Sequence, residues 1–342
     1  MYQNIPVNVI SGFLGSGKTT LIRNLLSKVP AGEKWAVLVN EFGEVGIDGA
    51  LLADTGASIK EVPGGCLCCV TSAAFSTGLN GLIKQVNPDR ILIEPTGIGH
   101  PAEIMAQLQS EHYQGVLDVK ASVCLLDVRN LQDPRYLGHP AFFDQIDQAD
   151  VLIASKADQY TEGQQDEFLA FVAQLKEPKK YAFAFHGDMA LAWLDYSKAE
   201  ALSAYHHQHS HHEHSHHHED SHQHEDSHQH GSQTLKLQYD RVTCYEKRDQ
   251  ALCSLGWVMA GEMHFQQVRL EKLAAQLQDC LGFWRLKGRL NLSSDRAIDC
   301  NITQTEQAFI TQDSVFQSKI ECLVDDETQL DKVKRLIEKA LF

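Results

Sequence analysis

Short apolar runs alternate with helical patterns between residues 7 and 185. Several runs are apolar at nearly every position, which is typical of strands buried on both faces of a parallel sheet. A helical stripe from Leu21 to Val29 precedes Pro30, which we expect to end that helix. The alternation predicts a doubly wound, mostly parallel α/β domain. Its expected strands are 7–10, 35–40, 91–94, 121–127, 151–155 and 181–185.

A second globular pattern begins after Ser232. Strands are predicted at 234–237, 254–259 and 318–324. Two helices are predicted from apolar residues at helical spacing. Strands mixed with two helices indicate a small α+β domain. The two stripes are Leu270, Leu273, Leu277 and Leu281, and Leu330, Val333, Ile337 and Leu341.

Residues 206–230 separate the two patterns. They hold 13 of the 18 histidines, five acidic residues and no apolar residue. Such a segment cannot bury enough surface to offset its chain entropy, so we expect a disordered linker. The predicted organisation is therefore 1–200, a linker at 201–233, and 234–342. The imidazoles and carboxylates suit loose binding of borderline divalent ions such as zinc and nickel, and a merely solubilising linker is the alternative.

Composition narrows the class of protein. The chain has 342 residues and a net charge of −15, without a basic stripe, so nucleic acid is not an expected partner. No apolar run approaches the roughly 20 residues that cross a bilayer, and no signal peptide is apparent, so we expect a cytoplasmic protein without a membrane partner. An odd number of cysteines, nine, favours reduced thiols or metal ligands. Six are isolated and are expected to pack as small apolar residues: Cys124, Cys244, Cys253, Cys280, Cys300 and Cys322.

Residues 12–19 match the phosphate-loop pattern G-x-x-x-x-G-K-[ST], between a predicted strand and a predicted helix. The glycines let backbone N–H groups surround phosphate oxygens, the lysine adds positive charge, and the hydroxyl after it binds Mg²⁺. The helix begins at the lysine, so its positive end faces the anion. The motif predicts phosphate binding by Gly12, Gly15, Ser16, Gly17, Lys18, Thr19 and Thr20.

An apolar strand ending at Glu94, followed by Pro95, Thr96 and Gly97, predicts a second part of this site. A carboxylate at such a strand end holds Mg²⁺ or positions the attacking water, and the Gly97 amide is expected to sense a γ-phosphate. A merely exposed strand-end glutamate is the alternative. We assign catalytic roles to Lys18, Thr19, Glu94 and Gly97, with Mg²⁺ held through Thr19 and Glu94.

Residues 155–158, Ser-Lys-Ala-Asp, follow another apolar strand and favour GTP over ATP. Asp158 is suited to accept from two N–H donors of a guanine edge, and Lys156 is suited to lie over the base. GTPases usually carry Asn where this chain has Ser155, so one amide that braces the loop is lost. His186 and Gly187 follow the next strand and are suited to close the base pocket through their backbone, and a purely structural role for His186 is the alternative.

Residues 63–69 read Pro-Gly-Gly-Cys-Leu-Cys-Cys, with three thiols in four residues on a glycine-rich turn. Zinc favours thiolates at about 2.3 Å in tetrahedral geometry, so Cys66, Cys68 and Cys69 are candidate zinc ligands. Adjacent cysteines rarely both bind one ion without strain, which makes Cys69 the least secure ligand. Redox chemistry and packing are the alternatives.

Residues 40–48 lie upstream and carry three acids. In P-loop GTPases this position holds a switch segment ordered by γ-phosphate and Mg²⁺. An oxygen ligand from Glu41 or Glu44 would tie metal affinity to the nucleotide state. A solvated loop is the alternative.

Segments 12–20, 40–48, 64–69, 94–97 and 155–158 together resemble the CobW family of metallochaperone GTPases, related to the hydrogenase- and urease-maturation GTPases. The C-x-C-C signature between the switch segment and the Glu94 strand separates this family from other GTPases. The part containing residues 285–288 looks like the smaller CobW C-terminal domain.

The resemblance implies a GTP hydrolase that uses GTP, Mg²⁺ and Zn²⁺. GTP would organise Cys66 and Cys68 into a tight site, and hydrolysis would release zinc to a client metalloprotein. Zinc-dependent self-association is also implied. The rival hypotheses are a nickel or cobalt insertase, a zinc buffer or sensor gated by GTP, and a P-loop kinase or ATPase.

Overall fold

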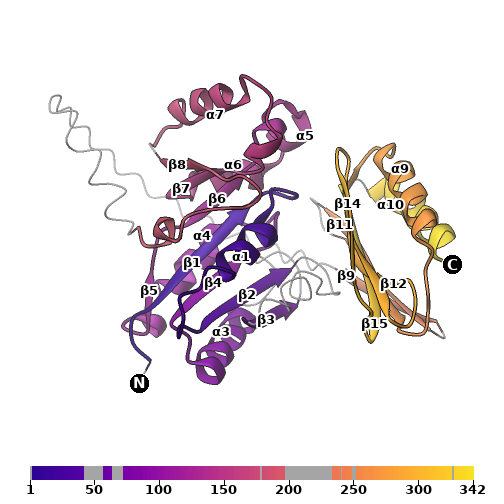
Figure 1. Cartoon of the computed structure of the whole chain (residues 1–342), viewed down its shortest axis with the longest axis horizontal. Coiled ribbons are helices and arrows are strands. Elements are labelled where there is room, and N and C mark those ends of the chain that lie inside the picture. The colour runs from indigo at the N-terminus through magenta and orange to yellow at the C-terminus, as the bar shows by residue number, and fades with distance from the viewer. Residues whose placement is uncertain are drawn as a thin grey trace, which may run out of the picture.

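The computed structural model describes residues 2–41, 57–63, 72–177, 179–196, 233–239, 241–248, 252–325 and 327–342. These residues form two sheets, one in each predicted domain (Figure 1). The histidine-rich segment 206–230 lies outside the described residues. No helix in the described ranges is both long and apolar enough to cross a membrane.

The first sheet is parallel and has the order β3-β2-β4-β1-β6-β7-β8, with β5 beside β1. The strands are β1 (Ile5–Gly12), β2 (Trp35–Glu41), β3 (Ser58–Pro63), β4 (Arg90–Glu94), β5 (Leu117–Val119), β6 (Val123–Leu126), β7 (Val151–Ala154) and β8 (Lys180–Phe183). The α-helices are α1 (Lys18–Leu26), α3 (Ser72–Val86), α4 (Pro101–Leu108), α5 (Pro134–Leu137), α6 (Pro140–Asp147) and α7 (Gln164–Ala173). Short 3₁₀ turns are η2 (Glu111–Tyr113), η3 (Val128–Gln132), η4 (Ala157–Gln159) and η5 (Leu191–Leu194).

Both faces of this sheet are buried, as the continuous apolar strands predicted. Val9 and Leu38 belong to a core that includes residues of α3 and α4. Ile10, which follows Val9, and Val37, which precedes Leu38, belong to a second core with Leu21 of α1. Neighbouring residues of one strand point to opposite faces, so each strand needs apolar residues throughout. The doubly wound α/β prediction is confirmed.

The six predicted strands correspond to β1, β2, β4, β6, β7 and β8. Helix α1 begins at Lys18 as predicted but ends at Leu26, before Pro30. Strands β3 and β5 were not predicted. Strand β3 is short and carries Lys60 and Glu61 at an edge, and β5 has three residues, so neither produces a continuous apolar run.

The second sheet is antiparallel, with the order β14-β13-β12-β15-β11-β10-β9. Figure 1 shows its two helices on the face turned away from the first domain. The elements are β9 (Gln233–Tyr239), β10 (Val242–Arg248), β11 (Cys253–Ala260), α9 (Gln267–Gln278), β12 (Phe283–Asn291), β13 (Arg296–Thr303), β14 (Gln307–Asp313), β15 (Gln317–Val324) and α10 (Glu327–Leu341). A small α+β domain is therefore confirmed.

Two sequence predictions for this domain need correction. Leu281 was expected on the buried stripe of the first helix, but α9 ends at Gln278 and Leu281 is 78% exposed. The predicted strands omitted β10, β12, β13 and β14. In β12 the apolar Leu286 and Leu290 join the core under the helices, whereas Arg285 and Lys287, on either side of Leu286, line a cleft toward the first domain. That charged alternation concealed the strand.

Candidate functional site

The loop between β1 and α1 is shaped by glycines at Gly12, Gly15 and Gly17, which have φ values of 140°, 74° and 92°. These values lie where L side chains are strained. A Cβ on Gly12 would also lie 2.5 Å from Ser16 Oγ and 2.7 Å from Leu125 O. Gly17 is the N-cap of α1, so the N–H groups of the loop lie next to those at the helix N-terminus, where an anion can bind. This is the backbone arrangement of a phosphate-binding loop.

Lys18 lies inside this loop and is 6% exposed. Its Nζ donates to the Gly12 carbonyl at 2.8 Å and to the Phe13 carbonyl at 3.4 Å. Burial lowers the pKa of Lys18 to about 8, and the nearby Glu94 opposes that shift. A buried cation of this kind gains most from an arriving phosphate, because the anion replaces the favourable interaction with water that burial removed.

Thr19 and Glu94 join the helix start to the end of β4. The Thr19 hydroxyl donates to Glu94 Oε1 at 3.1 Å, and Glu94 is 2% exposed. Burial raises the pKa of Glu94 above its usual value, while Lys18 and the Thr19 hydrogen bond lower it. The other carboxylate oxygen, Oε2, is buried without a hydrogen-bond partner among the described residues. An oxygen pair with one unsatisfied carboxylate oxygen suits a hard cation such as Mg²⁺.

Gly97 approaches the phosphate loop closely. A Cβ at this position would lie 2.8 Å from Leu14 Cδ2 and 3.1 Å from Lys18 Nζ, so a larger residue would press on both side chains. Gln145 donates to the Gly97 carbonyl at 3.1 Å and fixes the turn. The structure thus brings together Lys18, Thr19, Glu94 and Gly97, the four residues assigned catalytic roles. Those roles stay predictions.

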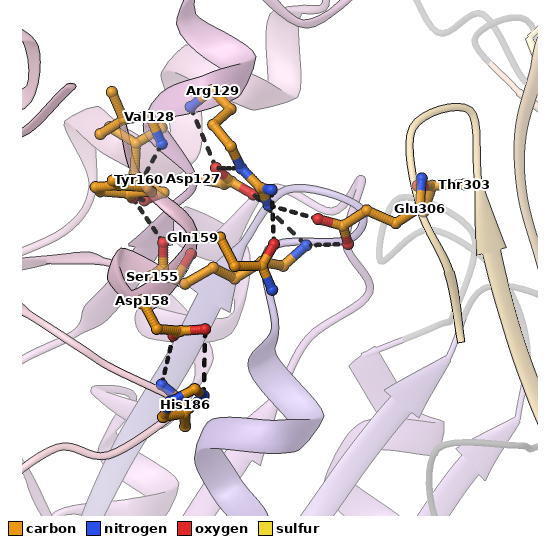
Figure 2. A network of polar contacts seen from close by, with 12 residues as sticks. Asp127, Val128, Arg129, Ser155, Asp158, Gln159, Tyr160, His186, Thr303 and Glu306 are labelled. Atoms are coloured by element: carbon orange, nitrogen blue, oxygen red, sulfur yellow. Dashed lines mark hydrogen bonds and ion pairs between the residues drawn. The ribbon is translucent and has the colours of Figure 1, made fainter. Parts of the chain in front are cut away.

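A second cleft, of about 300 Å³, lies beside the loop and is lined by Ser16, Thr20, Lys156, Asp158 and His186, among others. Asp158 Oδ1 accepts from the His186 backbone N–H at 2.6 Å, and the His186 ring nitrogen lies 3.2 Å from Oδ2 (Figure 2). Lys156 and His186 both have left-handed backbone, with φ of 55° and 53°. Strained residues of this kind cluster at ligand sites. The structure therefore places the predicted base-binding residues on one cleft.

The C-terminal domain contributes residues that the sequence did not assign to the site. A cleft of about 350 Å³ is lined by Lys18, Thr19 and Glu94 on one side and by Arg285 and Lys287 on the other. Residues 285–288 attracted notice only as part of the family resemblance. No local pattern reveals that β12 lies opposite the phosphate loop, because that placement depends on the packing of two domains.

An aromatic cluster fastens the phosphate loop to the C-terminal domain. The Phe13 ring lies 5.5 Å from Trp284 and 5.3 Å from Tyr136, all in edge-to-face geometry. Trp284 is 4% exposed, and its core also includes Leu252 and Leu323. Such aromatic contacts add to the free energy of burial. The tip of the loop is therefore held by both domains.

The metal segment falls mostly outside the described residues: Cys66, Cys68, Cys69 and Glu44 are among those not described. Glu41 is described as the last residue of β2, where its backbone pairs with Pro63, the last residue of β3. In the part of the chain that the structure describes, no group of three metal-ligating side chains occurs. The six isolated cysteines are all buried, as expected for packing, and burial raises the pKa of Cys124 to about 11 and that of Cys300 to about 12.

The family description "CobW/HypB/UreG, nucleotide-binding domain" matches residues 6–183, which contain all of the parallel sheet except its first residue, Ile5. The chain belongs to the CobW/HypB/UreG family. The resemblance expected from the sequence is therefore confirmed.

Curated relatives of this CobW-family chain carry metal-related names. The zinc chaperone YeiR of Escherichia coli is 45% identical over 207 residues, covering 60% of this chain and 63% of YeiR. The zinc chaperone CobW of Pseudomonas aeruginosa is 33% identical over 186 residues, covering 45% of this chain and 49% of that protein. The matched region thus spans less than two thirds of either relative.

Zn(II)-bound YjiA GTPase from E. coli is similar over 98% of this chain and 99% of its own, with 16% identity and a TM-score of 0.44. The strand order of this chain, rather than that superposition, defines its fold.

Proposed function

We propose that this chain is a zinc-binding GTPase that couples GTP binding and hydrolysis to the transfer of zinc to a client protein. The observation that carries the proposal is the pairing of β2 with β3 through Glu41 and Pro63. In parallel strands the carboxyl ends meet at one edge of the sheet. The predicted switch segment and the cysteine segment therefore leave neighbouring strands at the edge that also carries Glu94 and the phosphate loop.

The residues of the nucleotide site account for the proposed binding and hydrolysis of GTP. Lys18 neutralises phosphate charge, and backbone N–H groups of the loop bind phosphate oxygens. Thr19 and Glu94 would hold Mg²⁺, which would supply further positive charge to the phosphates. Asp158 selects guanine because its carboxylate accepts from two N–H groups that adenine lacks in that geometry. Gly97 leaves room for the γ-phosphate beside Lys18.

Zinc is the cargo, and Cys66 and Cys68 are its principal proposed ligands, with Cys69, Glu44 and Glu41 as further candidates. Thiolates favour zinc over harder cations. The names of YeiR and the P. aeruginosa CobW support zinc as the metal. We further propose a cytoplasmic location and a zinc-dependent homo-oligomer. The histidines of 206–230 would raise the local zinc concentration rather than form a defined site.

The function is tested by following zinc during a single turnover. Protein loaded with zinc and Mg²⁺–GTP is mixed with a zinc indicator, and zinc release and phosphate release are recorded together. With GTP, we expect zinc to be released at the same rate as phosphate. With a non-hydrolysable GTP analogue, we expect zinc to be released only at its basal rate. Equal release with GTP and the analogue would contradict the proposal. Deleting 206–230 is expected to lower the number of zinc ions bound and leave hydrolysis unchanged.

A further inference from the structure

The turn between β13 and β14 in the C-terminal domain reaches residues 155–158 of the first domain, the predicted guanine motif (Figure 2). Glu306 in this turn contacts Lys156 Nζ through Oε2 at 2.6 Å and Arg129 through Oε1 at 2.5 Å. Asp127 lies 3.5 Å from the same lysine nitrogen. The carboxylate of Glu306, in the C-terminal domain, therefore contacts Lys156 of the first domain, the lysine that is expected to lie over the base.

Glu306 is held in place by its own turn. Its backbone N–H donates to Thr303 Oγ1 at 3.1 Å, and its carbonyl accepts from Thr303 N at 2.8 Å. Gln278 of α9 donates to the carbonyl of Thr303 at 3.0 Å. Arg129, the second partner of Glu306, is fixed by Asp127 through contacts of 2.9 and 2.6 Å. The carboxylate is thus presented in one orientation, which favours positioning over a loose surface ion pair.

The same turn also borders the phosphate loop. A Cβ on Gly15 would lie 3.5 Å from Thr303 Cγ2. Gly15, Lys156, Thr303 and Glu306 line one cavity of about 180 Å³. The turn therefore borders the phosphate loop through Thr303 and contacts the guanine motif through Glu306, so it lies next to both halves of the predicted nucleotide site.

This link lies next to a local deficiency in the guanine motif. Ser155 is 3% exposed, and its Oγ has no hydrogen-bond partner among the described residues. The shorter side chain does not provide the brace that an amide gives at this position. Lys156 follows with a left-handed φ of 55°, a conformation that persists only when its surroundings hold it.

We propose that Glu306 is a positioning residue for GTP binding. It holds Lys156 against the base, and its turn braces the guanine motif against the phosphate loop in place of the amide that Ser155 lacks. The C-terminal domain is then part of the nucleotide site. The inference rests on the proposed GTP binding and adds a residue to it.

The test compares Glu306→Gln with Glu246→Gln in the full-length protein. Glu246 is a matched control, because it forms ion pairs with Arg248 and Lys334 within the C-terminal domain. We expect Glu306→Gln to raise the Kd for GDP and GTP about tenfold and to raise KM more than it lowers kcat. Glu246→Gln should leave both constants unchanged. Equal Kd values for wild type and Glu306→Gln would overturn the proposal.

A double-mutant cycle separates positioning from simple attachment of the domains. If Glu306 acts through Lys156, Glu306→Gln should have little further effect on Kd in a Lys156→Met background. Ser155→Asn in the Glu306→Gln variant should restore part of the lost affinity. Additive effects in the cycle would overturn the proposal, and so would a fall in melting temperature for Glu306→Gln without a change in Kd. Failure of the wild-type protein to bind GTP would instead refute the proposed function.

Discussion

Glu41 and Pro63 are paired at the last register position of two neighbouring parallel strands, β2 and β3. The segments that follow them carry the predicted switch acids and the three clustered cysteines. Two segments that start from adjacent backbone positions are well placed to respond to one another. We expect a change in the predicted switch segment on GTP binding to affect the zinc affinity of the cysteines.

Asp158 is expected to decide base preference. Replacing Asp158 with Asn removes an oxygen that accepts from guanine N–H groups. The new amide N–H donates instead, and therefore favours xanthine, which carries an oxygen where guanine has its amino group. We predict a loss of GTP affinity of about 10- to 100-fold, with a gain for xanthosine triphosphate. Competition binding with both nucleotides measures the change. Asp188→Asn, an exposed aspartate of the neighbouring loop, is the control, and an unchanged base preference would refute the guanine assignment.

Glu94 is expected to act on the Mg²⁺-dependent step rather than on nucleotide affinity. Glu94→Gln keeps the shape of the side chain and replaces the buried carboxyl group beside Thr19 with an amide that cannot ionise. We predict a fall in kcat of about 100-fold or more, while GDP affinity measured with a chelator present stays unchanged. Glu103→Gln, exposed on α4, should keep full activity. Wild-type turnover by Glu94→Gln would remove this residue from the mechanism.

The buried Lys18 predicts a pH dependence. Its pKa is lowered to about 8, so the ammonium is charged below that pH and neutral above it. Only the charged form attracts phosphate, and GDP affinity should therefore fall as the pH rises above about 8, by up to tenfold per pH unit. Isothermal titration between about pH 7 and 9 records this decline. Lys18→Met should bind weakly with a flat profile, and a sloping profile in that variant would assign the effect to another group.

Trp284 is expected to stabilise the contact between domains. Trp284→Ala removes a side chain packed against Phe13 and Tyr136. We predict a loss of about 3–5 kcal/mol in the free energy of unfolding, together with weaker GDP binding because Phe13 belongs to the phosphate loop. Chemical denaturation measures the first effect. Phe316→Ala is the control, since that ring is 91% exposed.

Most of the parallel sheet could be predicted because several of its strands are apolar at nearly every position, as Val7 and Ile10 are on opposite faces of β1. The C-terminal sheet was harder to predict. Its β12 carries Arg285 and Lys287 toward the nucleotide cleft, so its polar residues hide a strand whose other face is core. An open cleft between domains allows charges that a fully buried sheet excludes.

The phosphate loop and Glu94 were predictable because their chemistry lies in short contiguous motifs. Glu306 was not, because it lies 150 residues from Lys156 in the sequence and meets it only after the domains pack. A lone glutamate in a turn carries no local signal. The spacing of residues within a motif does not predict contacts between elements that are far apart in the sequence.

The measurement that tests the central claim most directly is a competitive titration of zinc, nickel and cobalt, with Mg²⁺–GTP and with Mg²⁺–GDP. We expect selective zinc binding that is at least tenfold tighter in the GTP state, and loss of that difference in the Cys66→Ser, Cys68→Ser double variant. Equal zinc affinity with both nucleotides would contradict the coupling of the nucleotide site to the zinc site, and would favour a protein that stores zinc. Preference for nickel or cobalt would contradict zinc as the cargo.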